Sequence, residues 1–259
     1  LWVGADKGLN QVDLNANSFN NLKLTNQNNV DNSIITDIIA TGQPNEIWVS
    51  SNGGGLNYIS MNTHLLAPRI QHYELETQQN SRHANFVSSM LIDKSGSIWA
   101  STHGAGLLNI IPPDPLLNTN KLKVQQQFTK ENQSLKDDYL MALLESEEGD
   151  IWIGYWSDGL SRFDKKNNHF HHYQMTSNGE VDLSLFPNVE LIETIENGKS
   201  YLWVGTRGNG LFKLFFDDKE QTLQLIESYQ AGQNDEISSN FITSIYQEND
   251  EVLWIGTES

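Results

Sequence analysis

The sequence predicts an all-β protein built from repeated units, and two observations support this prediction. A short phrase recurs along the whole chain: an aliphatic residue, Trp, an aliphatic residue or Ala, and then Gly or Ser. The tryptophans of this phrase are evenly spaced, because their successive residue numbers differ by 46, 51, 53, 51 and 51. A nearly fixed interval of this size indicates a repeat architecture. The repeated residues are Trp2, Trp48, Trp99, Trp152, Trp203 and Trp254.

Each period contains four short segments with strand character, which we name a, b, c and d in chain order. Strand a is rich in β-branched and aromatic residues, strand b is the Trp phrase, and strand c follows a glycine-containing turn. No segment shows a sustained helical period of apolar residues. Strand a is expected at 34–39, 86–92, 139–144, 189–195 and 240–247, strand c at 56–59, 107–111, 160–163 and 211–216, and strand d at 223–229.

Four antiparallel strands in a period of about 51 residues predict the blades of a β-propeller. Strand b is apolar at consecutive positions, as in Leu253-Trp254-Ile255, whereas a sheet with one solvated face would alternate. Both faces of a blade are therefore expected to be covered by its neighbours. The repeated tryptophans are interpreted as packing residues and not as ligand contacts. The glycines of the b–c turns are interpreted as hairpin residues with positive φ, because no helix follows them as in a phosphate-binding loop.

A single partial propeller is expected to fill residues 1–259. Complete blades are predicted at 32–78, 85–131, 138–177 and 188–231, with strands b–d of another blade at 1–28 and strands a–b of a further one at 238–259. If the two ends formed one blade, strand b would be present twice. We therefore predict that the ends do not close as a regular blade and that the chain, which starts within a Trp phrase, is a fragment of a larger ring.

Composition excludes several classes of partner. The formal net charge is −17, with 33 acidic and 16 basic residues, which argues against nucleic acid and anionic membrane as partners. No apolar run approaches the roughly 18 residues of a spanning helix, so no direct membrane insertion is expected. The chain has no cysteine, so disulfides and thiolate metal sites are excluded. No cofactor is indicated.

The strand order also predicts where a ligand would bind. In antiparallel blades, the b–c and d–a connections share one face of the disc, and these loops vary from blade to blade on a repeated frame. Variable polar and aromatic loops on a rigid scaffold are typical of binding surfaces. The candidate ligand-binding residues are Asn52, His103, Tyr155, Trp156, Asp158, Arg207 and Asn209 from the b–c loops, and Asn85 and Tyr139 from the d–a loops.

Trp156 is the most specific of these candidates. It stands outside the Trp repeat, at a loop position that Asn52, His103 and Arg207 are expected to fill in other blades. An exposed aromatic side chain near Asp158 would suit a sugar ring, whose C–H face stacks while its hydroxyls form hydrogen bonds. The alternative is that Trp156 packs across the gap between blades.

Other motifs support metal binding or catalysis weakly. His169 and His171 would share one face of strand d, but no third ligand is placed near them. The acidic run Glu145 to Asp150 is interpreted as a solvated a–b turn rather than a calcium site. The chain lacks a Gly-x-Ser-x-Gly elbow, a His-Glu-x-x-His motif and a cysteine nucleophile. We therefore expect no metal and no catalytic residue in this chain.

The repeat resembles that of a known family. Strand a segments such as Asn240 to Gln247, the phrase Leu253 to Thr257, and the continuation Gly159-Leu160-Ser161-Arg162-Phe163-Asp164 are similar to the two-component regulator propeller repeat. This resemblance implies a seven-bladed propeller that serves as the periplasmic sensor domain of a bacterial hybrid histidine kinase or a related diguanylate cyclase. It further implies an oligosaccharide as the small-molecule ligand, a homodimeric full-length receptor and no catalysis in this part. Sialidase, kelch and WD-repeat blades fit the spacing less well.

Three hypotheses about function follow. The favoured one is a ligand-sensing module, and the second is a scaffold for protein–protein interaction. The third is an enzyme similar to the streptogramin lyase propellers, which would require a histidine and a carboxylate such as His103 and Asp158 at one site.

Overall fold

The structure is a computed structural model that describes residues 1–5, 8–13, 18–22, 24, 34–61, 68–77, 81–113, 121–177, 179, 181–232 and 237–258. The chain divides into two compact units, Leu1–Thr129 (unit 1) and Lys130–Ser259 (unit 2), and each is described by itself. The predicted boundaries at Asn28, Asn32, Gln78 and Ser259 lie outside the described residues. In the described part, no helix has the length and apolar character needed to cross a bilayer.

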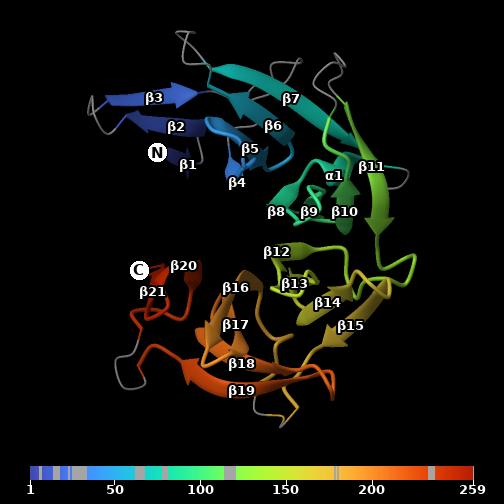
Figure 1. Ribbon diagram of the computed structural model, residues 1–259, viewed down its shortest axis with the longest axis vertical. Helices are drawn as coiled ribbons and strands as arrows, with labels where there is room; N and C mark the ends of the chain where they lie inside the picture. The colour runs from blue at the N-terminus through green and yellow to red at the C-terminus, as the bar shows by residue number, and fades with distance from the viewer. Residues whose placement is uncertain are drawn as a thin grey trace. The chain divides into compact units, whose positions relative to one another are not determined.

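Unit 1 contains strands β1–β11 and one helical turn, α1 (Figure 1). Strands β1–β3 form blade 1, β4–β7 blade 2 and β8–β11 blade 3. The bounds are β1 Trp2–Ala5, β2 Gly8–Asp13, β3 Ser18–Leu22, β4 Ile35–Ala40, β5 Glu46–Ser51, β6 Gly55–Ser60, β7 Arg69–Glu76, α1 Ser81–Ala84, β8 Val87–Ile92, β9 Ile98–Thr102, β10 Leu107–Ile110 and β11 Lys121–Phe128.

Unit 2 contains two four-stranded sheets and one two-stranded sheet (Figure 1). Strands β12–β15 form blade 4, β16–β19 form blade 5, and β20–β21 form a two-stranded sheet that we name blade 6. The bounds are β12 Leu140–Glu145, β13 Ile151–Tyr155, β14 Leu160–Asp164, β15 His169–Tyr173, β16 Asn188–Glu196, β17 Lys199–Thr206, β18 Leu211–Asp217, β19 Thr222–Tyr229, β20 Ile242–Asn249 and β21 Val252–Thr257.

Within each blade, consecutive strands pair in antiparallel fashion, and the Trp phrase is always strand b. Most strand ends lie within two residues of the predicted ends. Four-stranded antiparallel sheets that repeat along an all-β chain confirm the predicted fold class, a β-propeller.

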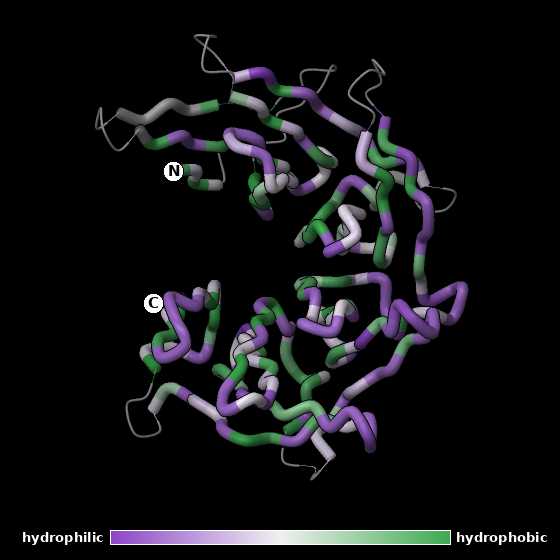
Figure 2. The backbone as a smooth tube through the Cα atoms, viewed as in Figure 1, coloured by the Kyte–Doolittle hydropathy of each residue, from purple (hydrophilic) through white to green (hydrophobic). Residues whose placement is uncertain are grey.

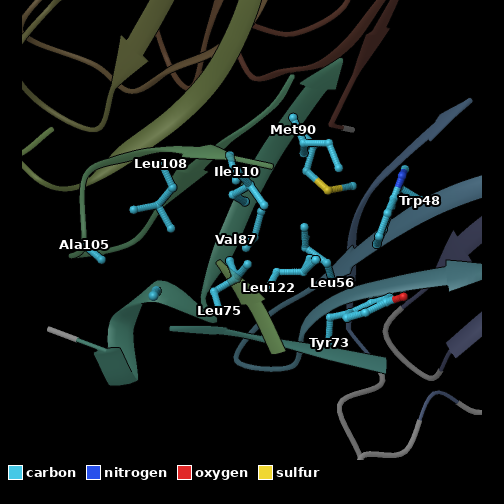
Figure 3. Packing of buried hydrophobic residues seen from close by; sticks show 13 residues of the cluster. Trp48, Leu56, Tyr73, Leu75, Val87, Met90, Ala105, Leu108, Ile110 and Leu122 are labelled. Atoms are coloured by element: carbon cyan, nitrogen blue, oxygen red, sulfur yellow. The ribbon is translucent and has the colours of Figure 1, made fainter. Parts of the chain in front are cut away.

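The tryptophans of the central blades are packing residues, as predicted. Trp48, Trp99, Trp152 and Trp203 are 3–8% exposed. In unit 1, one hydrophobic cluster joins blades 2 and 3, with Trp48 and Tyr73 at one end and Ala105 and Leu108 at the other (Figure 3). Trp254 is 62% exposed at the edge of the two-stranded sheet.

Glycine is required in the b–c turn for steric reasons. Gly210 has a φ of 78°, and a Cβ atom there would lie 2.1 Å from the carbonyl oxygen of Tyr229. Positive φ at this position and the lack of space both require glycine. The hydroxyl of Thr206 closes the same turn by donating to the Gly210 carbonyl at 2.9 Å, and Thr102 donates to Gly106 in the same way at 2.8 Å.

The outer strands of blades 2 and 3 depart from the expected separate sheets. Residues Glu74–Glu76 of β7 extend past β6 and pair in parallel with Lys121–Lys123 of β11, which extend past β10. The two blades therefore form a continuous eight-stranded sheet. Both strands are eight residues long, so their ends carry backbone groups that strand c cannot pair. An ion pair between Lys121 and Glu76 accompanies this pairing.

The a–b turn of blade 3 is organised by one buried carboxylate. Asp93 accepts hydrogen bonds from the amides of Ser95 and Ser97 at 2.9 and 3.0 Å, and its Oδ2 accepts the indole N–H of Trp99 at 2.8 Å. Asp93→Ala is expected to lower the free energy of unfolding by about 2–3 kcal/mol, because it leaves these donors without their acceptor. Urea unfolding followed by tryptophan fluorescence measures this loss. A loss below about 0.5 kcal/mol would contradict it, and Lys94→Ala in the same turn is the matched control.

Candidate functional site

The b–c loop of each blade is bonded to the start of strand a. In unit 2, the amide of Trp156 donates to the carbonyl of Tyr139 at 3.1 Å, and the amide of Arg207 donates to that of Pro187 at 2.9 Å. In unit 1, Asn52 and His103 make the same bond at 3.0 and 2.8 Å. Trp156 therefore occupies the position of Asn52, His103 and Arg207, as predicted. The b–c and d–a connections share one face within each unit.

The accepting residue of this bond is an exposed apolar residue in most blades. Phe86 is 39% exposed, Tyr139 50%, Phe241 46% and Ile34 45%. Each of these residues lies just before strand a, beyond the buried part of its blade. Phe86 and Phe241 were not among the predicted site residues, although the pairs Asn85-Phe86, Asp138-Tyr139 and Asn240-Phe241 repeat a polar–aromatic pattern that could have identified them.

In unit 2, Tyr139 and Trp156 form the candidate site on blade 4. Trp156 is 48% exposed, so about half of this residue is accessible to solvent. The loop before Tyr139 is mostly hydrophilic (Figure 2). It is held by Asp137, whose Oδ1 accepts the amides of Asp138 and Tyr139 at 2.6 and 3.2 Å. This turn fixes the backbone that presents the tyrosine ring.

A carboxylate is close in sequence to each aromatic residue, since Asp138 precedes Tyr139 and Asp158 follows Trp156 by two positions. Asp138 accepts the amide of Lys130 at 2.7 Å, and burial raises the pKa of its carboxyl group. Asp158 is partly buried in the same b–c loop as Trp156 and makes no ion pair with a described residue. Two exposed aromatic residues next to carboxylate acceptors can hold a ring that is apolar on one face and carries hydroxyl groups.

Tyr155 is not in the exposed loop where the sequence placed it. It ends strand β13 and is fully buried, and its hydroxyl bonds to that of Ser161 at 2.8 Å. Burial raises the pKa of this phenol. The reason is that β13 extends one residue further than the Trp phrase, which turns Tyr155 into the blade and leaves Trp156 as the first loop residue. The buried Tyr155 side chain therefore supports the loop that carries Trp156.

Arg207 and Asn209 lie on blade 5. The guanidinium of Arg207 is exposed, and its Nη2 lies 3.6 Å from Oε1 of Glu258. Its backbone forms a β-bridge with Phe241 of blade 6. The Asn209 side chain accepts a hydrogen bond from Gln230 at 2.7 Å. The arginine can reach a ligand, whereas the asparagine is engaged with its own blade.

Three of the predicted residues lie in unit 1. Asn52 is exposed and forms a β-bridge with Phe86, and Nε2 of His103 is a buried atom without a hydrogen-bond partner in the described part. Burial lowers the pKa of the His103 imidazole. The Oδ1 of Asn85 accepts the amide of Leu75 at 2.9 Å, so this side chain closes the d–a connection. Asn240 and Asp138 do the same in unit 2.

The histidine and acidic motifs have local structural partners. The rings of His169 and His171 lie 4.8 Å apart, and the described residues contain no group of three or more metal-ligating side chains. Glu145 forms an ion pair with Lys165 at 2.9 Å.

Comparisons with known proteins agree with the fold. The model of the two-component regulator propeller matches residues 236–259 and confirms the repeat recognised from the sequence. No curated protein matches the chain in sequence. A solved structure similar to the chain is the extracellular domain of a proposed hybrid two-component system from B. thetaiotaomicron, with 19% identity, a TM-score of 0.66, and coverage of 99% of this chain and 30% of that one. The chain therefore spans under a third of that relative's length.

Other similar structures belong to different classes of protein. A luciferin-regenerating enzyme has 15% identity and a TM-score of 0.57, over 97% of this chain and 77% of its own. The β-propeller domain of Myceliophteria thermophila Cps50 (Swd1) has 9% identity and a TM-score of 0.59, over 94% and 72%. At these identities the likeness shows the propeller fold alone.

Proposed function

We propose that this chain is the ligand-sensing propeller of an extracytoplasmic signalling receptor of the two-component type. The family match at residues 236–259 and the likeness to an extracellular domain of a proposed hybrid two-component system support this class. In the full-length receptor the propeller lies in the periplasm, acts in a homodimer and passes its signal to a kinase or cyclase module. Within this part, the chain binds a ligand and does not transform it.

The observation that supports the ligand class is the pair Tyr139 and Trp156. Both residues are about half exposed, at 50% and 48%. The backbone amide of Trp156 donates a hydrogen bond to the carbonyl of Tyr139. Large aromatic residues normally bury their apolar surface, so two exposed ones on a loop face indicate a binding surface. We propose an oligosaccharide, with a sugar ring on Trp156 and its hydroxyls on Asp158.

Among the described residues, Ser161 and His172 have a geometry that could suggest an enzyme. The Ser161 hydroxyl lies 2.7 Å from Nδ1 of His172, as in a nucleophile and its base. Ser161 is fully buried in strand β14, however, and bonds also to Tyr155. A substrate cannot reach this pair, which serves the packing of blade 4. His103 and Asp158, the pair considered for a lyase, belong to different units.

The test of the proposed function is binding without turnover. We expect one oligosaccharide of a polysaccharide-derived library to raise the melting temperature of the chain, because a ligand that binds the folded state stabilises it. Trp156→Ala should weaken the binding of this ligand at least about fivefold, since stacking on an aromatic ring contributes about 1 kcal/mol or more. The melting temperature without ligand should stay the same.

Tyr246→Ala is the matched control, because Tyr246 is a 65% exposed aromatic residue of blade 6 outside the b–c and d–a loops. It should leave binding intact. Conversion of the sugar would show an enzyme, and binding only to a protein would show a scaffold. Loss of folding in Trp156→Ala would show that the residue packs between blades.

A further inference from the structure

A cavity lies in unit 1, whereas the proposed sugar site belongs to unit 2. It has a volume of about 440 Å³ and opens between blades 2 and 3, beside the a–b turns and the described residues at the end of strand c and the start of strand d. This is the face opposite the b–c and d–a loops. The volume falls within the range of small-molecule sites. The residues that line the cavity include three aromatic residues, two charged residues and one proline: Trp48, Tyr58, Tyr73, Glu46, Arg69 and Pro112.

Three aromatic rings of blade 2 form one wall of the cavity. The ring centroid of Trp48 lies 5.3 Å from that of Tyr58 and 5.6 Å from that of Tyr73, with interplanar angles of 58° and 47°. Trp48 and Tyr73 lie at the end of the hydrophobic cluster of unit 1 (Figure 3). All three rings line the cavity, although Trp48 and Tyr73 are each only 4% exposed and Tyr58 is partly buried.

The equivalent gap between blades 4 and 5 is filled by the protein itself. There the phenyl ring of Phe216 packs edge-on against Trp152 at 5.4 Å and against Tyr173 at 6.2 Å. Strand pairing makes Pro112 of blade 3 the counterpart of Phe216, since Asn109 and Lys213 both lie opposite the repeated tryptophan. Proline is too small to reach the tryptophan, so the place of the phenyl ring is open between blades 2 and 3.

Blade 2 also lacks the cationic side chain that blades 4 and 5 carry opposite the repeated tryptophan. Opposite the repeated tryptophan, blade 4 has Arg162 and blade 5 has Lys213. Arg162 pairs with Asp150 at 3.2 Å and lies 4.4 Å from the ring centre of Phe216. Lys213 pairs with Glu196 at 2.7 Å and lies 5.2 Å from the ring centre of Trp203.

In blade 2 this position is Tyr58, whereas the acidic residue remains. Trp48 lies opposite Tyr58, and Glu46, two residues before Trp48, is the counterpart of Asp150. Burial, followed by a hydrogen bond with Glu46, raises the pKa of Tyr58 to about 12, so the phenol is neutral. The gap between blades 2 and 3 therefore has the aromatic rings and the carboxylate found in the other gap. In blade 2, however, no side chain of strand c supplies the positive charge that Arg162 supplies in blade 4.

We infer that this cavity binds a small organic cation, which takes the place that protein side chains fill between blades 4 and 5. A quaternary ammonium group is the best match, because aromatic faces attract such cations and a cage of several rings is their usual site. Glu46 adds a carboxylate at the cavity wall. The net charge of −17 also favours the approach of cations.

Arg69 provides a way to test the charge of the ligand. It is an exposed residue of the cavity lining, and its Nη2 lies 3.5 Å from Oε1 of Gln71. A guanidinium at this rim repels a cation and attracts an anion. Arg69→Gln is therefore expected to strengthen the binding of a cation and to weaken that of an anion.

Calorimetric titration of the full chain with choline tests the inference. Its uncharged isostere 3,3-dimethylbutan-1-ol has the same shape, so the difference reports the charge alone. We expect choline to bind at least about tenfold more tightly. Glu46→Gln should reduce choline binding at least about threefold and leave the isostere unchanged, and Arg69→Gln should increase choline binding. Equal affinity for both compounds, or no binding of choline, overturns the inference.

The place of binding is tested by filling the cavity. Pro112→Phe restores the ring found between blades 4 and 5 and should abolish choline binding. Ile111→Phe is the matched control, because Ile111 is a 45% exposed neighbour outside the cavity lining, and it should bind choline as before. Choline binding by folded Pro112→Phe would contradict the site, and Glu46→Gln decides it if that variant does not fold. Trp156→Ala should bind choline normally, which separates this site from the proposed sugar site.

Discussion

Arg162→Ala is expected to lower the free energy of unfolding by about 3–5 kcal/mol, since it leaves a carboxylate in the gap between blades 4 and 5 without its cation. Arg162 is only 5% exposed. Its guanidinium lies 3.2 Å from Asp150 and 3.6 Å from Asp218, and it stacks on the ring of Phe216. The variant loses the ion pair, the stacking and the packing of the arginine stem. Urea unfolding at neutral pH measures the loss.

Two further variants separate these contributions. Arg162→Lys keeps the charge but not the planar stacking, so it should lose less than Arg162→Ala. The double variant Arg162→Met with Asp150→Asn removes both charges, and its loss should be smaller than the sum of the single losses. A loss below about 1 kcal/mol for Arg162→Ala would mean that water solvates Asp150 in the gap.

Acid is expected to destabilise blade 4 through His172. Burial, followed by the nearby charges of Lys136, His169 and His171, lowers the pKa of His172 from 6.5 to about 4. The folded state therefore binds its proton more weakly than the unfolded state. The stabilisation is present above pH 6.5 and is lost as the pH falls towards 4, and it amounts to about 2–3 kcal/mol. The Ser161 hydroxyl bonds to Nδ1 of this ring at 2.7 Å.

The variant His172→Gln isolates this effect. Burial raises the pKa of Asp138 and Asp150, and these groups act in the opposite sense, because their contribution is lost as the pH rises. The comparison is therefore the change in unfolding free energy between pH 7 and pH 4.5, measured in both proteins. This change should be smaller by about 2 kcal/mol in the variant. Equal changes in the two proteins would show that His172 is protonated in the folded state.

Much of the fold follows from local patterns. The Trp phrase, the b–c glycines and the β-branched strand a recur in each period, so several copies agree on the register. Equivalence of Trp156 with Asn52, His103 and Arg207 also follows from this register, and the backbone hydrogen bonds confirm it. The parallel pairing of β7 with β11 could not be predicted, because it depends on how far two outer strands extend past their partners.

The candidate site was predictable only in part. Tyr155 and Trp156 are neighbours of similar character in the sequence, yet one is buried and the other is exposed. The direction of a side chain at a strand end depends on where pairing stops, which is decided by the neighbouring strand. Asn85 looks like a polar loop residue, but its side chain closes the d–a connection through Leu75.

The sequence by itself determined the repeat, the four-strand blade and the face on which the variable loops lie, because periodicity records contacts that every blade makes. The tertiary structure alone decided which residues that depart from the repeat are exposed, as Trp156 is, and which leave a cavity between blades, as Pro112 does. The difference between Pro112 and Phe216 has no meaning until strand pairing makes them counterparts. A cavity is the absence of a neighbour, and a neighbour from another blade is known only when the chain is folded.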